Sequence, residues 1–496
     1  MSDKKLSELL RGLYVKKIDG DQNREITGIA YDSRKVKPGF LFCCLQGTKH
    51  DGHVFAQQAI EKGARAVLAE KDVKITKGTR ILVPNVRWAL PYIAANFYGY
   101  PSEKMSLIGV TGTNGKTTTT HLIEKILASS GEKTGLIGTI CYKIAEERRP
   151  PLATTPEASD LQHFLQEMML QGVQTAVLEV SSHALAQDRV AGCHFDVAVL
   201  TNITGDHLDF HQTFEDYRAA KGKLFASLGG SFFKQGRAKL AVLNRDDPNF
   251  DYIAVQSSVQ RLTYGLRSDA DLHAFDVTAS SGGITFKLNS PWGQATFHLK
   301  LSGLFNVYNS LAAIAVGLSR NIDLQQIKDV LEEVEGIAGR FEKVDCGQEF
   351  MVIVDYAHTP DGLENLLAAV KEIAVGRIIT VFGCGGDRDR SKRPLMGRVA
   401  TSYSDYAILT SDNPRSEDPA AIAREVEEGM VSQGKEYQVI LDRFEAIRQA
   451  ISLARKDDIV VIAGKGHEDY QIFRDRTIHF SDREAARKIL QERLAP

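Results

Sequence analysis

The residues best suited to chemistry lie in the run Thr111–Thr117, which reads Thr-Gly-Thr-Asn-Gly-Lys-Thr. Its two glycines allow backbone amides to wrap a polyphosphate, Lys116 supplies a positive charge for the outer phosphates, and the Thr117 hydroxyl is a suitable Mg²⁺ ligand. The strict motif has a glycine five residues before Gly115, where this chain has Val110. We therefore predict a variant phosphate-binding loop that holds a nucleoside triphosphate.

Further polar residues follow two apolar runs downstream of this loop. Glu179 lies at the end of the run Ala176–Val180, and His207 follows the run Val197–Thr201. In a parallel sheet the carboxyl ends of such strands meet at one edge, where ligands bind. Because Mg²⁺ prefers oxygen ligands, we expect Glu179 and Thr117 to hold the ion, whereas His207 is a less typical ligand.

Lys221 lies on the apolar face of the predicted helix Thr213–Leu228. Tyr217 and Phe225 are four residues before and after it, so all three share one face. In one interpretation the lysine stem packs and the ammonium reaches water, which is the commoner fate. In the other, burial lowers the pKa of the amine, and the neutral amine adds CO₂ to become a carbamate that can bind metal. Both interpretations remain open at this point.

The elements that must position these residues alternate between strands and helices. The predicted strands are Glu25–Ala30, Gly39–Cys44, Ala66–Ala69, Arg80–Val83, Leu107–Val110, Gly135–Ile137, Ala176–Val180, Val197–Thr201, Leu240–Leu243, Phe350–Val354, Arg377–Phe382, Tyr406–Leu409, Gln438–Leu441 and Ile459–Ala463. This alternation predicts α/β domains with mostly parallel sheets. The length of 496 residues exceeds what one core supports. We predict a small N-terminal α/β domain (1–100), a central, doubly wound P-loop domain (101–335) and a C-terminal Rossmann-like α/β domain (336–496).

Composition and charge exclude several classes of protein. The formal net charge of −2 provides no basic field that would attract nucleic acid or an anionic membrane. No run approaches the ~18 apolar residues of a membrane span, and the N-terminus lacks the apolar segment of a signal peptide. The six cysteines show neither metal-type spacing nor a disulfide framework. We therefore expect a cytoplasmic protein with buried cysteines, no nucleic-acid partner and no membrane insertion.

Taken together, these motifs resemble the Mur ligase family, whose members are ATP-dependent amino-acid ligases of peptidoglycan synthesis. The resemblance covers essentially the whole chain, and the family's own loop shares the departure at Val110. The residues that carry the resemblance are Thr111–Thr117, Glu179-Val-Ser-Ser-His183, Thr201-Asn202, Asp206-His207, Tyr217-Arg-Ala-Ala-Lys221, Asn306 to Asn309, Arg340 and Asp355-Tyr-Ala-His358.

The resemblance implies a nucleotide site, a metal site and a monomer. The expected ATP contacts are Thr111, Gly112, Thr113, Asn114, Gly115, Lys116, Thr117, Asn309, Arg340 and Asp355. The expected catalytic residues are Lys116, Glu179, His207 and a carbamylated Lys221. The expected Mg²⁺ ligands are Thr117, Glu179, His207 and the carbamylated Lys221.

Within the family, the chain is similar to members that add meso-diaminopimelate to UDP-N-acetylmuramoyl-L-alanyl-D-glutamate. Ser33 matches the uridine-nucleotide position, and the other implied contacts with this substrate are Thr154, Thr155, Ser181, Gln187 and Arg189. The implied diaminopimelate pocket consists of Arg388, Asp412, Asn413, Pro414, Arg415, Gly464 and Glu468.

Arg415 offers a physical reason for choosing diaminopimelate. This amino acid has a second carboxylate at the end where lysine has none, and a guanidinium can bind that carboxylate with two parallel hydrogen bonds. The rivals are a lysine-adding ligase, a folylpolyglutamate synthetase and a nucleotide-hydrolysing switch. The switch would use Asn244-Arg-Asp-Asp247, which faintly resembles a guanine-reading motif.

Overall fold

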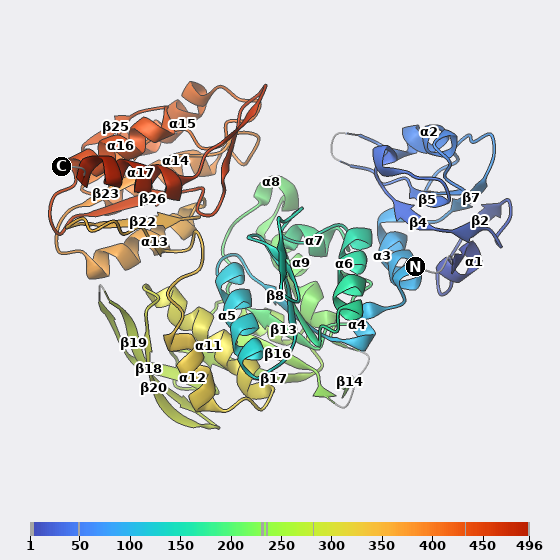
Figure 1. The fold of residues 1–496 in the computed structure, drawn as a ribbon, viewed down its shortest axis with the longest axis horizontal. Coiled ribbons are helices and arrows are strands. Elements are labelled where there is room, and N and C mark those ends of the chain that lie inside the picture. Colours follow the sequence, from blue (N-terminus) through green and yellow to red (C-terminus); the bar gives the residue numbers. More distant parts are fainter. Residues whose placement is uncertain are drawn as a thin grey trace.

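The structure is a computed structural model that describes residues 4–47, 50–229, 233–234, 237–280, 282–431 and 433–494. It forms three lobes that follow one another along the chain. In Figure 1 the N-terminal lobe is at the right, the central lobe is in the middle, and the C-terminal lobe is at the upper left. Each lobe is built on its own main sheet, with helices packed against it.

The N-terminal lobe contains a five-stranded sheet in the order β2-β7-β6-β5-β4. Strands β4 to β7 are parallel, and β2 is antiparallel to β7. The predicted strand Glu25–Ala30 is divided at Thr27, since Glu25–Ile26 pairs with Lys4–Lys5 in a separate ribbon. The elements are β1 (Lys4–Lys5), α1 (Leu6–Leu9), β2 (Lys17–Asp19), β3 (Glu25–Ile26), β4 (Gly28–Ala30), η1 (Ser33–Lys35), β5 (Phe40–Cys43), η2 (Gly52–Phe55), α2 (Ala56–Glu61), β6 (Ala66–Ala69), β7 (Thr79–Leu82) and α3 (Val86–Tyr98).

The central lobe contains an eleven-stranded sheet in the order β11-β10-β9-β12-β8-β13-β16-β17-β18-β19-β20. Its middle, from β9 to β18, is parallel, which confirms the predicted doubly wound sheet. Antiparallel strands that were not predicted extend both edges. The elements are α4 (Pro101–Lys104), β8 (Ser106–Thr111), α5 (Lys116–Ser129), β9 (Thr134–Ile137), β10 (Tyr142–Ile144), β11 (Glu147–Arg149), α6 (Ala158–Leu170), β12 (Thr175–Glu179), α7 (Ser182–Ala186), β13 (Val197–Leu200), α8 (Leu208–His211), α9 (Phe214–Ala226), β14 (Phe233–Lys234), β15 (Arg237–Ala238), β16 (Leu240–Asn244), α10 (Phe250–Ala254), β17 (Gln260–Gly265), β18 (Leu272–Ser280), β19 (Gly283–Ser290), β20 (Gly293–Leu299), α11 (Leu304–Ser319) and α12 (Leu324–Glu332).

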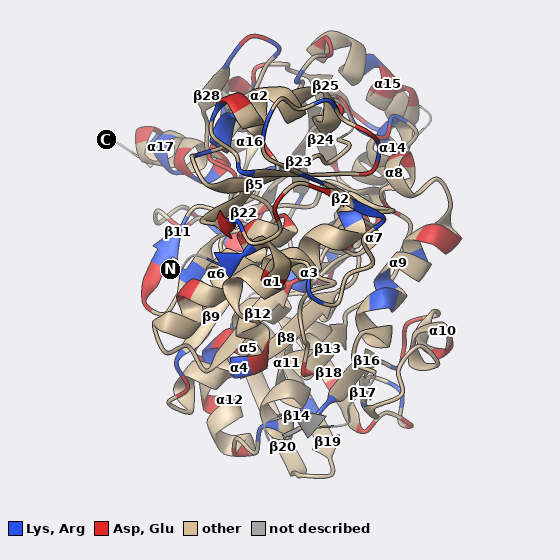
Figure 2. Cartoon of the chain, turned by 90° about the vertical axis from the view of Figure 1, so that its right-hand side faces the viewer, with Lys and Arg blue, Asp and Glu red and all other residues tan. Residues whose placement is uncertain are grey.

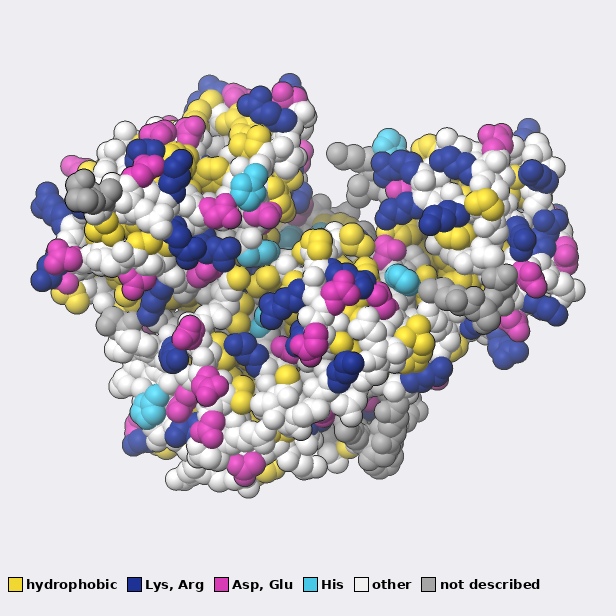
Figure 3. Space-filling model, in the orientation of Figure 1, with side chains coloured by type: hydrophobic (Ala, Val, Ile, Leu, Met, Phe, Trp, Pro, Cys, Tyr) yellow, Lys and Arg dark blue, Asp and Glu magenta, His cyan; other side chains and the backbone are white. Residues whose placement is uncertain are grey.

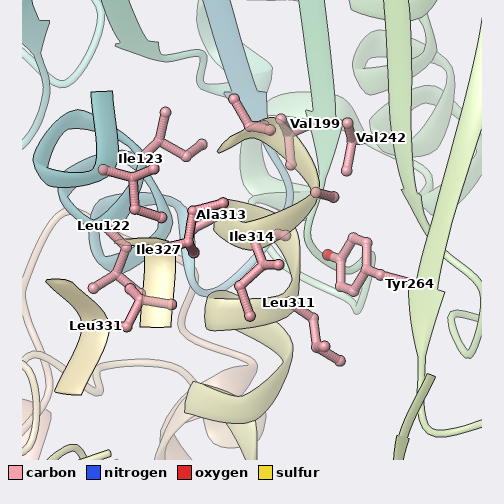
Figure 4. Packing of buried hydrophobic residues seen from close by; sticks show 14 of the residues in the cluster. Leu122, Ile123, Val199, Val242, Tyr264, Leu311, Ala313, Ile314, Ile327 and Leu331 are labelled. Carbon is pink, nitrogen blue, oxygen red and sulfur yellow. The ribbon is translucent and has the colours of Figure 1, made fainter. Parts of the chain in front are cut away.

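The helix that follows the phosphate-binding loop is anchored by a buried core. Leu122 and Ile123 of α5 lie near Ala313 and Ile314 of α11 in the same apolar cluster (Figure 4). Burial of such a leucine or isoleucine stabilises the fold by about 1.5–3 kcal/mol per side chain. Because α5 is held in this way, its first residue, Lys116, has a fixed position beyond the carboxyl end of β8.

The C-terminal lobe contains a six-stranded sheet in the order β21-β22-β26-β23-β24-β25, in which only β21 is antiparallel. All five predicted strands are present, although β25 lies one residue earlier and is shorter than predicted. The elements are β21 (Glu342–Lys343), β22 (Met351–Asp355), α13 (Pro360–Ile373), β23 (Ile378–Phe382), α14 (Lys392–Tyr403), β24 (Tyr406–Leu409), α15 (Pro419–Val431), β25 (Tyr437–Val439), α16 (Arg443–Leu453), β26 (Ile459–Ala463), β27 (Tyr470–Ile472), β28 (Thr477–His479) and α17 (Asp482–Leu494).

Acidic and basic residues are interspersed along the helices, strands and loops of the chain (Figure 2). None of the helices in the described ranges is long and apolar enough to cross a membrane. The six cysteines are all free, as expected, and all are buried except Cys346, which is half-buried.

Candidate active site

The phosphate-binding loop connects β8 to α5 and depends on two glycines. Gly112 has a φ of +153°, and a Cβ there would lie 1.9 Å from Thr201 Oγ1. Gly115 has a φ of +84°, and its Cβ would lie 2.3 Å from Asn309 Oδ1. Larger residues would therefore displace the neighbours that shape the loop. Lys116 Nζ folds back and donates to the carbonyl oxygens of Gly112 and Thr113, at 3.0 and 2.8 Å.

Two cavities meet at this loop, between the central and C-terminal lobes. The larger has a volume of about 440 Å³ and the smaller about 340 Å³. Asn114, Gly115 and Thr117 line both cavities, as do Arg340 and Tyr356. A polyphosphate on the loop would therefore be accessible from both cavities. Figure 3 shows a surface hollow above the central lobe, between the two outer lobes.

The larger cavity combines apolar walls with six of the expected nucleotide contacts, three of them from the loop. Leu304, Phe305, Leu366 and Ala369 supply an apolar surface that suits a base. Asn309, Arg340 and Asp355, for which the resemblance implies contacts with ATP, also line it.

Asp355 shapes this region through the backbone. Its two carboxylate oxygens accept hydrogen bonds from the amides of Phe341 and Ala357, each at 2.7 Å. Burial raises the pKa of Asp355, while Arg340 and these two amides act in the opposite direction. The carboxylate thus fixes the chain on either side of it, including the segment that carries Arg340.

The smaller cavity contains all four residues expected to bind metal. Glu179 is fully buried, and its Oε2 accepts hydrogen bonds from the hydroxyls of Thr117 and Thr139, both at 2.9 Å. Thr117 Oγ1 also accepts from Arg340 Nη2 at 3.1 Å. The threonine hydroxyl and the carboxylate are hard oxygen ligands that lie side by side, and they fit Mg²⁺.

Two of the three histidines that line this cavity, His183 and His207, are buried together in a way that favours their neutral form. His207 has a φ of +56°, and its ring lies 4.6 Å from that of His183. Burial lowers the pKa of both rings, to about 4 for His183. A neutral imidazole can act as a ligand or as a hydrogen-bonding group. Among the residues described, no three His, Cys, Asp or Glu side chains form a metal-binding group by themselves.

Lys221 is buried, so the structure excludes the interpretation in which its ammonium reaches water. Only 1% of the residue is exposed. Its Nζ donates to the carbonyl oxygen of Gly112 at 2.7 Å and lies 4.4 Å from the centre of the Tyr217 ring. Burial, with Lys116 nearby, holds the pKa of Lys221 well below its usual value. The amine is thus favoured in the neutral form that can add CO₂.

Most of the residues expected to contact the UDP-linked substrate surround this smaller cavity. Thr154, Thr155, Ser181 and Arg189 line it. Arg189 Nη1 donates to the carbonyl oxygen of Thr155 at 3.0 Å, and Nη2 donates to Gln187 Oε1 at 2.6 Å. These contacts arrange the arginine and the glutamine as one polar wall.

Ser33 lies apart, in η1 of the N-terminal lobe. It is not among the residues that line either cavity, and its carbonyl oxygen accepts from Lys62 Nζ at 2.9 Å. A ligand that reached both Ser33 and the smaller cavity would have to extend from one lobe to the next.

The expected amino-acid pocket lies at the carboxyl ends of β24 and β26, and none of its expected residues lines either cavity. Arg415 has a φ of +53°, and its Nη1 donates to the carbonyl oxygen of Gly386 at 2.8 Å. Gly464 has a φ of +121°, and a Cβ there would lie 2.9 Å from Asp412 Oδ2. The remaining expected members are Arg388, Asn413, Pro414 and Glu468, which lie on the same two loops or on the adjoining loop after β23.

Three residues of the guanine-like motif, Asn244, Asp246 and Asp247, line the larger cavity, but both carboxylates already accept hydrogen bonds from the protein. Asp247 Oδ2 accepts from the amide of Ile203 at 2.7 Å, and Asp246 accepts from the amide of Leu266 and the hydroxyl of Tyr308. These carboxylates stabilise the ends of neighbouring strands. The arrangement therefore gives no support to the nucleotide-switch alternative.

Sequence reasoning missed Thr139, Thr204 and Asp361, which connect parts of the site. Thr139 binds Glu179, while Asp361 accepts hydrogen bonds from Asn114 and Thr204. Thr359-Pro360-Asp361 carries the signature of a helix start, with Thr359 as the N-cap of α13. That signal locates Asp361 on the chain but does not reveal its partners in another lobe.

Comparison with known proteins places all three lobes in one family. Residues 25–98 match the description "Mur ligase family, catalytic domain", residues 110–317 match "Mur ligase middle domain", and residues 339–466 match "Mur ligase, glutamate ligase domain". The UDP-N-acetylmuramoyl-L-alanyl-D-glutamate–2,6-diaminopimelate ligase of Syntrophomonas wolfei is 50% identical over 98% of this chain and 99% of its own length. The ligase of the same name from Bacillus cereus is 49% identical over 99% of each chain. A solved structure of a ligase with this name is 35% identical, covers 100% of both chains and has a TM-score of 0.69. The chain therefore belongs to the Mur ligase family.

Proposed function

We propose that this chain uses ATP to join meso-2,6-diaminopimelate to the D-glutamyl side-chain carboxylate of UDP-N-acetylmuramoyl-L-alanyl-D-glutamate. The observation that carries the proposal is the meeting of two cavities at one phosphate-binding loop. A nucleotide in the larger cavity would present its γ-phosphate to a carboxylate in the smaller one. The relatives described above are named for the same reaction.

The reaction proceeds in two steps. The substrate carboxylate attacks the γ-phosphorus of ATP, and ADP leaves as an acyl phosphate forms. The amine of diaminopimelate then attacks the acyl carbon, phosphate leaves, and the nitrogen releases a proton as the amide forms. Lys116, at the junction of α5 and the loop, stabilises negative charge on the transferred phosphoryl group.

The loop residues Thr111 to Thr117 hold the phosphates, while Asn309, Arg340 and Asp355 position the nucleotide. The positions of Asn309 and Arg340 support these roles, because both side chains form hydrogen bonds with threonine hydroxyls of α5. Arg340 also stacks 4.6 Å above the Tyr356 ring. This contact holds the guanidinium where the two cavities meet.

Thr117, Glu179, His207 and a carbamylated Lys221 would hold Mg²⁺. The bound ion would neutralise charge on the phosphate oxygens and on the reacting carboxylate. The lysine is buried beside Gly112, in a cavity that Glu179, Asp206 and His207 also line. A carbamate would add two further anionic oxygens to this group.

Two substrate sites are proposed on opposite sides of this centre. Ser33 of the N-terminal lobe binds the uridine nucleotide, and Thr154, Thr155, Ser181, Gln187 and Arg189 bind the rest of that substrate. Arg388, Asp412, Asn413, Pro414, Arg415, Gly464 and Glu468 bind diaminopimelate. Because this pocket belongs to the C-terminal lobe, closure of that lobe brings the amine to the acyl phosphate.

We further propose domain boundaries near residues 100 and 335, a cytoplasmic location and a monomeric enzyme. The boundaries are supported by the three separate sheets, each with its own apolar clusters. The location is supported by the substrates, which are soluble precursors carrying a nucleotide.

Isotope transfer tests the proposed chemistry. With ¹⁸O in the D-glutamyl side-chain carboxylate, one labelled oxygen should appear in the released phosphate, because the carboxylate oxygen becomes the bridge of the acyl phosphate. Unlabelled phosphate, released at the rate of amide formation, would rule out this intermediate.

A further inference from the structure

A buried lysine lies beneath the proposed amino-acid pocket, in the loop that follows β26. Lys465 Nζ donates to Glu468 Oε2 at 3.0 Å and to Asn413 Oδ1 at 3.3 Å. The Lys465 side chain is fully buried, whereas that of Glu468 is 14% exposed. Since a buried ammonium must keep its acceptors, Lys465 restrains both partners.

These contacts fix the orientation of the Asn413 amide. Its Oδ1 also accepts from the amide of Ile472 at 3.0 Å, and its Nδ2 donates to Glu468 Oε2 at 2.9 Å. Oε2 of Glu468 is therefore held by two donors, one neutral and one cationic. The partly exposed Glu468 carboxylate is thus pre-oriented at the pocket surface, where it suits a ligand ammonium.

Lys465 also contributes to the charge balance of the pocket. Burial lowers the pKa of Arg415, and the charges of Arg388, Asp412 and Glu468 lie close enough to act on it. Arg388 is exposed, whereas Lys465 and Arg415, with the carboxylates of Asp412 and Glu468, are buried or half-buried, so Lys465 supplies one of the two positive charges that lie within the pocket wall. The neighbouring pair of Arg443 and Asp482 is neutral as a unit.

The positive charge of Lys465 affects the two candidate amino acids differently. The distal end of diaminopimelate carries an ammonium and a carboxylate and is neutral overall. The distal end of lysine carries only an ammonium. Positive charge in a low-dielectric pocket therefore opposes lysine more strongly than diaminopimelate.

On the basis of the proposed function, we propose that Lys465 is a specificity-determining residue. It orients Asn413 and Glu468 and makes the pocket reject an amino acid whose distal end is only cationic. It acts through these neighbours and through its charge, not on the reacting atoms.

The test compares kcat/KM for meso-diaminopimelate with kcat/KM for L-lysine in the same variant. Lys465→Met keeps most of the side chain's length but removes the charge, and the ratio of kcat/KM for meso-diaminopimelate to that for L-lysine should fall on the order of tenfold. Glu468→Gln should raise the ratio, because lysine loses its distal partner while diaminopimelate keeps the carboxylate bound by Arg415. Thus, the two substitutions should change selectivity in opposite directions.

Arg377→Met is the matched control for loss of a charge pair in the same lobe. Arg377 Nη2 binds Asp458 at 2.7 Å, just before the first residues of β23 and β26 and at the opposite end of the sheet from the pocket. Its loss should lower stability, measured by thermal unfolding, without changing the selectivity ratio.

An unchanged ratio in Lys465→Met, or a change in the same direction in both variants, overturns the inference. If Lys465→Met does not fold, Glu468→Gln decides alone, and an unchanged or lower ratio overturns the proposal. Failure of the unsubstituted enzyme to make amide product with diaminopimelate would instead refute the proposed function.

Discussion

Asn114 Nδ2, in the phosphate-binding loop, donates a hydrogen bond of 2.6 Å to Asp361 Oδ2, at the start of α13 in the C-terminal lobe. Thr204 Oγ1 donates to the same oxygen at 3.0 Å. The lobe that carries the proposed amino-acid pocket is therefore bonded directly to the loop that is expected to hold ATP. This contact provides a physical route by which lobe closure and phosphate binding depend on each other.

Asp361→Ala should lower kcat. It removes the acceptor of both interlobe hydrogen bonds, and a small misplacement of reacting groups costs up to about 100-fold in rate. Steady-state phosphate release with all three substrates measures the effect. Asp361→Asn keeps an amide oxygen that can accept both bonds, so its kcat should remain near that of the unsubstituted enzyme. Full activity of the alanine variant would remove Asp361 from the closure mechanism.

Lys221→Ala should abolish amide formation, because it removes the amine that becomes the proposed carbamate. In the unsubstituted enzyme, depletion of CO₂ and bicarbonate should lower activity, and bicarbonate should restore it. Lys223→Ala is the control on the same helix, since Lys223 is half exposed and binds Asp188 at 3.1 Å. A Lys221→Ala enzyme with normal turnover would refute the carbamate role.

Arg415→Met should weaken the use of diaminopimelate specifically. Loss of one partner of a hydrogen-bonded charge pair costs about 2–5 kcal/mol, so kcat/KM for diaminopimelate should fall by roughly 30- to 5000-fold. KM values for ATP and for the UDP-linked substrate should remain unchanged. Arg424→Met, on the exposed face of α15, is the control. Equal losses for all three substrates would indicate a general structural defect and contradict the assignment.

Arg443→Met should destabilise the C-terminal lobe. Arg443 and Asp482 form a fully buried pair at 2.7 Å, and removal of one partner of such a pair costs about 3–5 kcal/mol. Urea unfolding measures the loss. The double variant Arg443→Met/Asp482→Leu leaves no unpaired buried charge and should recover much of the stability. If the double variant is as unstable as the single variant, the unpaired charge is not the cause.

Local features of the site could be predicted from the sequence. Glycine spacing located the loop, apolar runs located the central strands, and the helical period placed Lys221 on a buried face. These signals depend on near neighbours along the chain. The strands β18 to β20, toward one edge of the central sheet, were missed because each has an exposed face, so their apolar runs are interrupted.

Contacts between lobes could not be predicted in this way. Arg340 reaches Thr117 across 223 positions, and Asp361 reaches Asn114 across 247. Such contacts depend on how two separately folded lobes pack, and no local periodicity encodes that packing. The motif residues were therefore recognised individually, while their joint arrangement around two cavities emerged only from the structure.

Phosphate release from ATP tests the central claim most directly. It is measured with UDP-N-acetylmuramoyl-L-alanyl-D-glutamate and with meso-diaminopimelate, L-lysine or no amino acid, and the tripeptide product is quantified in parallel. We predict phosphate and product in equal amounts with diaminopimelate and little of either in the other two reactions. Equal phosphate release in all three reactions, without product, would contradict a diaminopimelate-adding ligase.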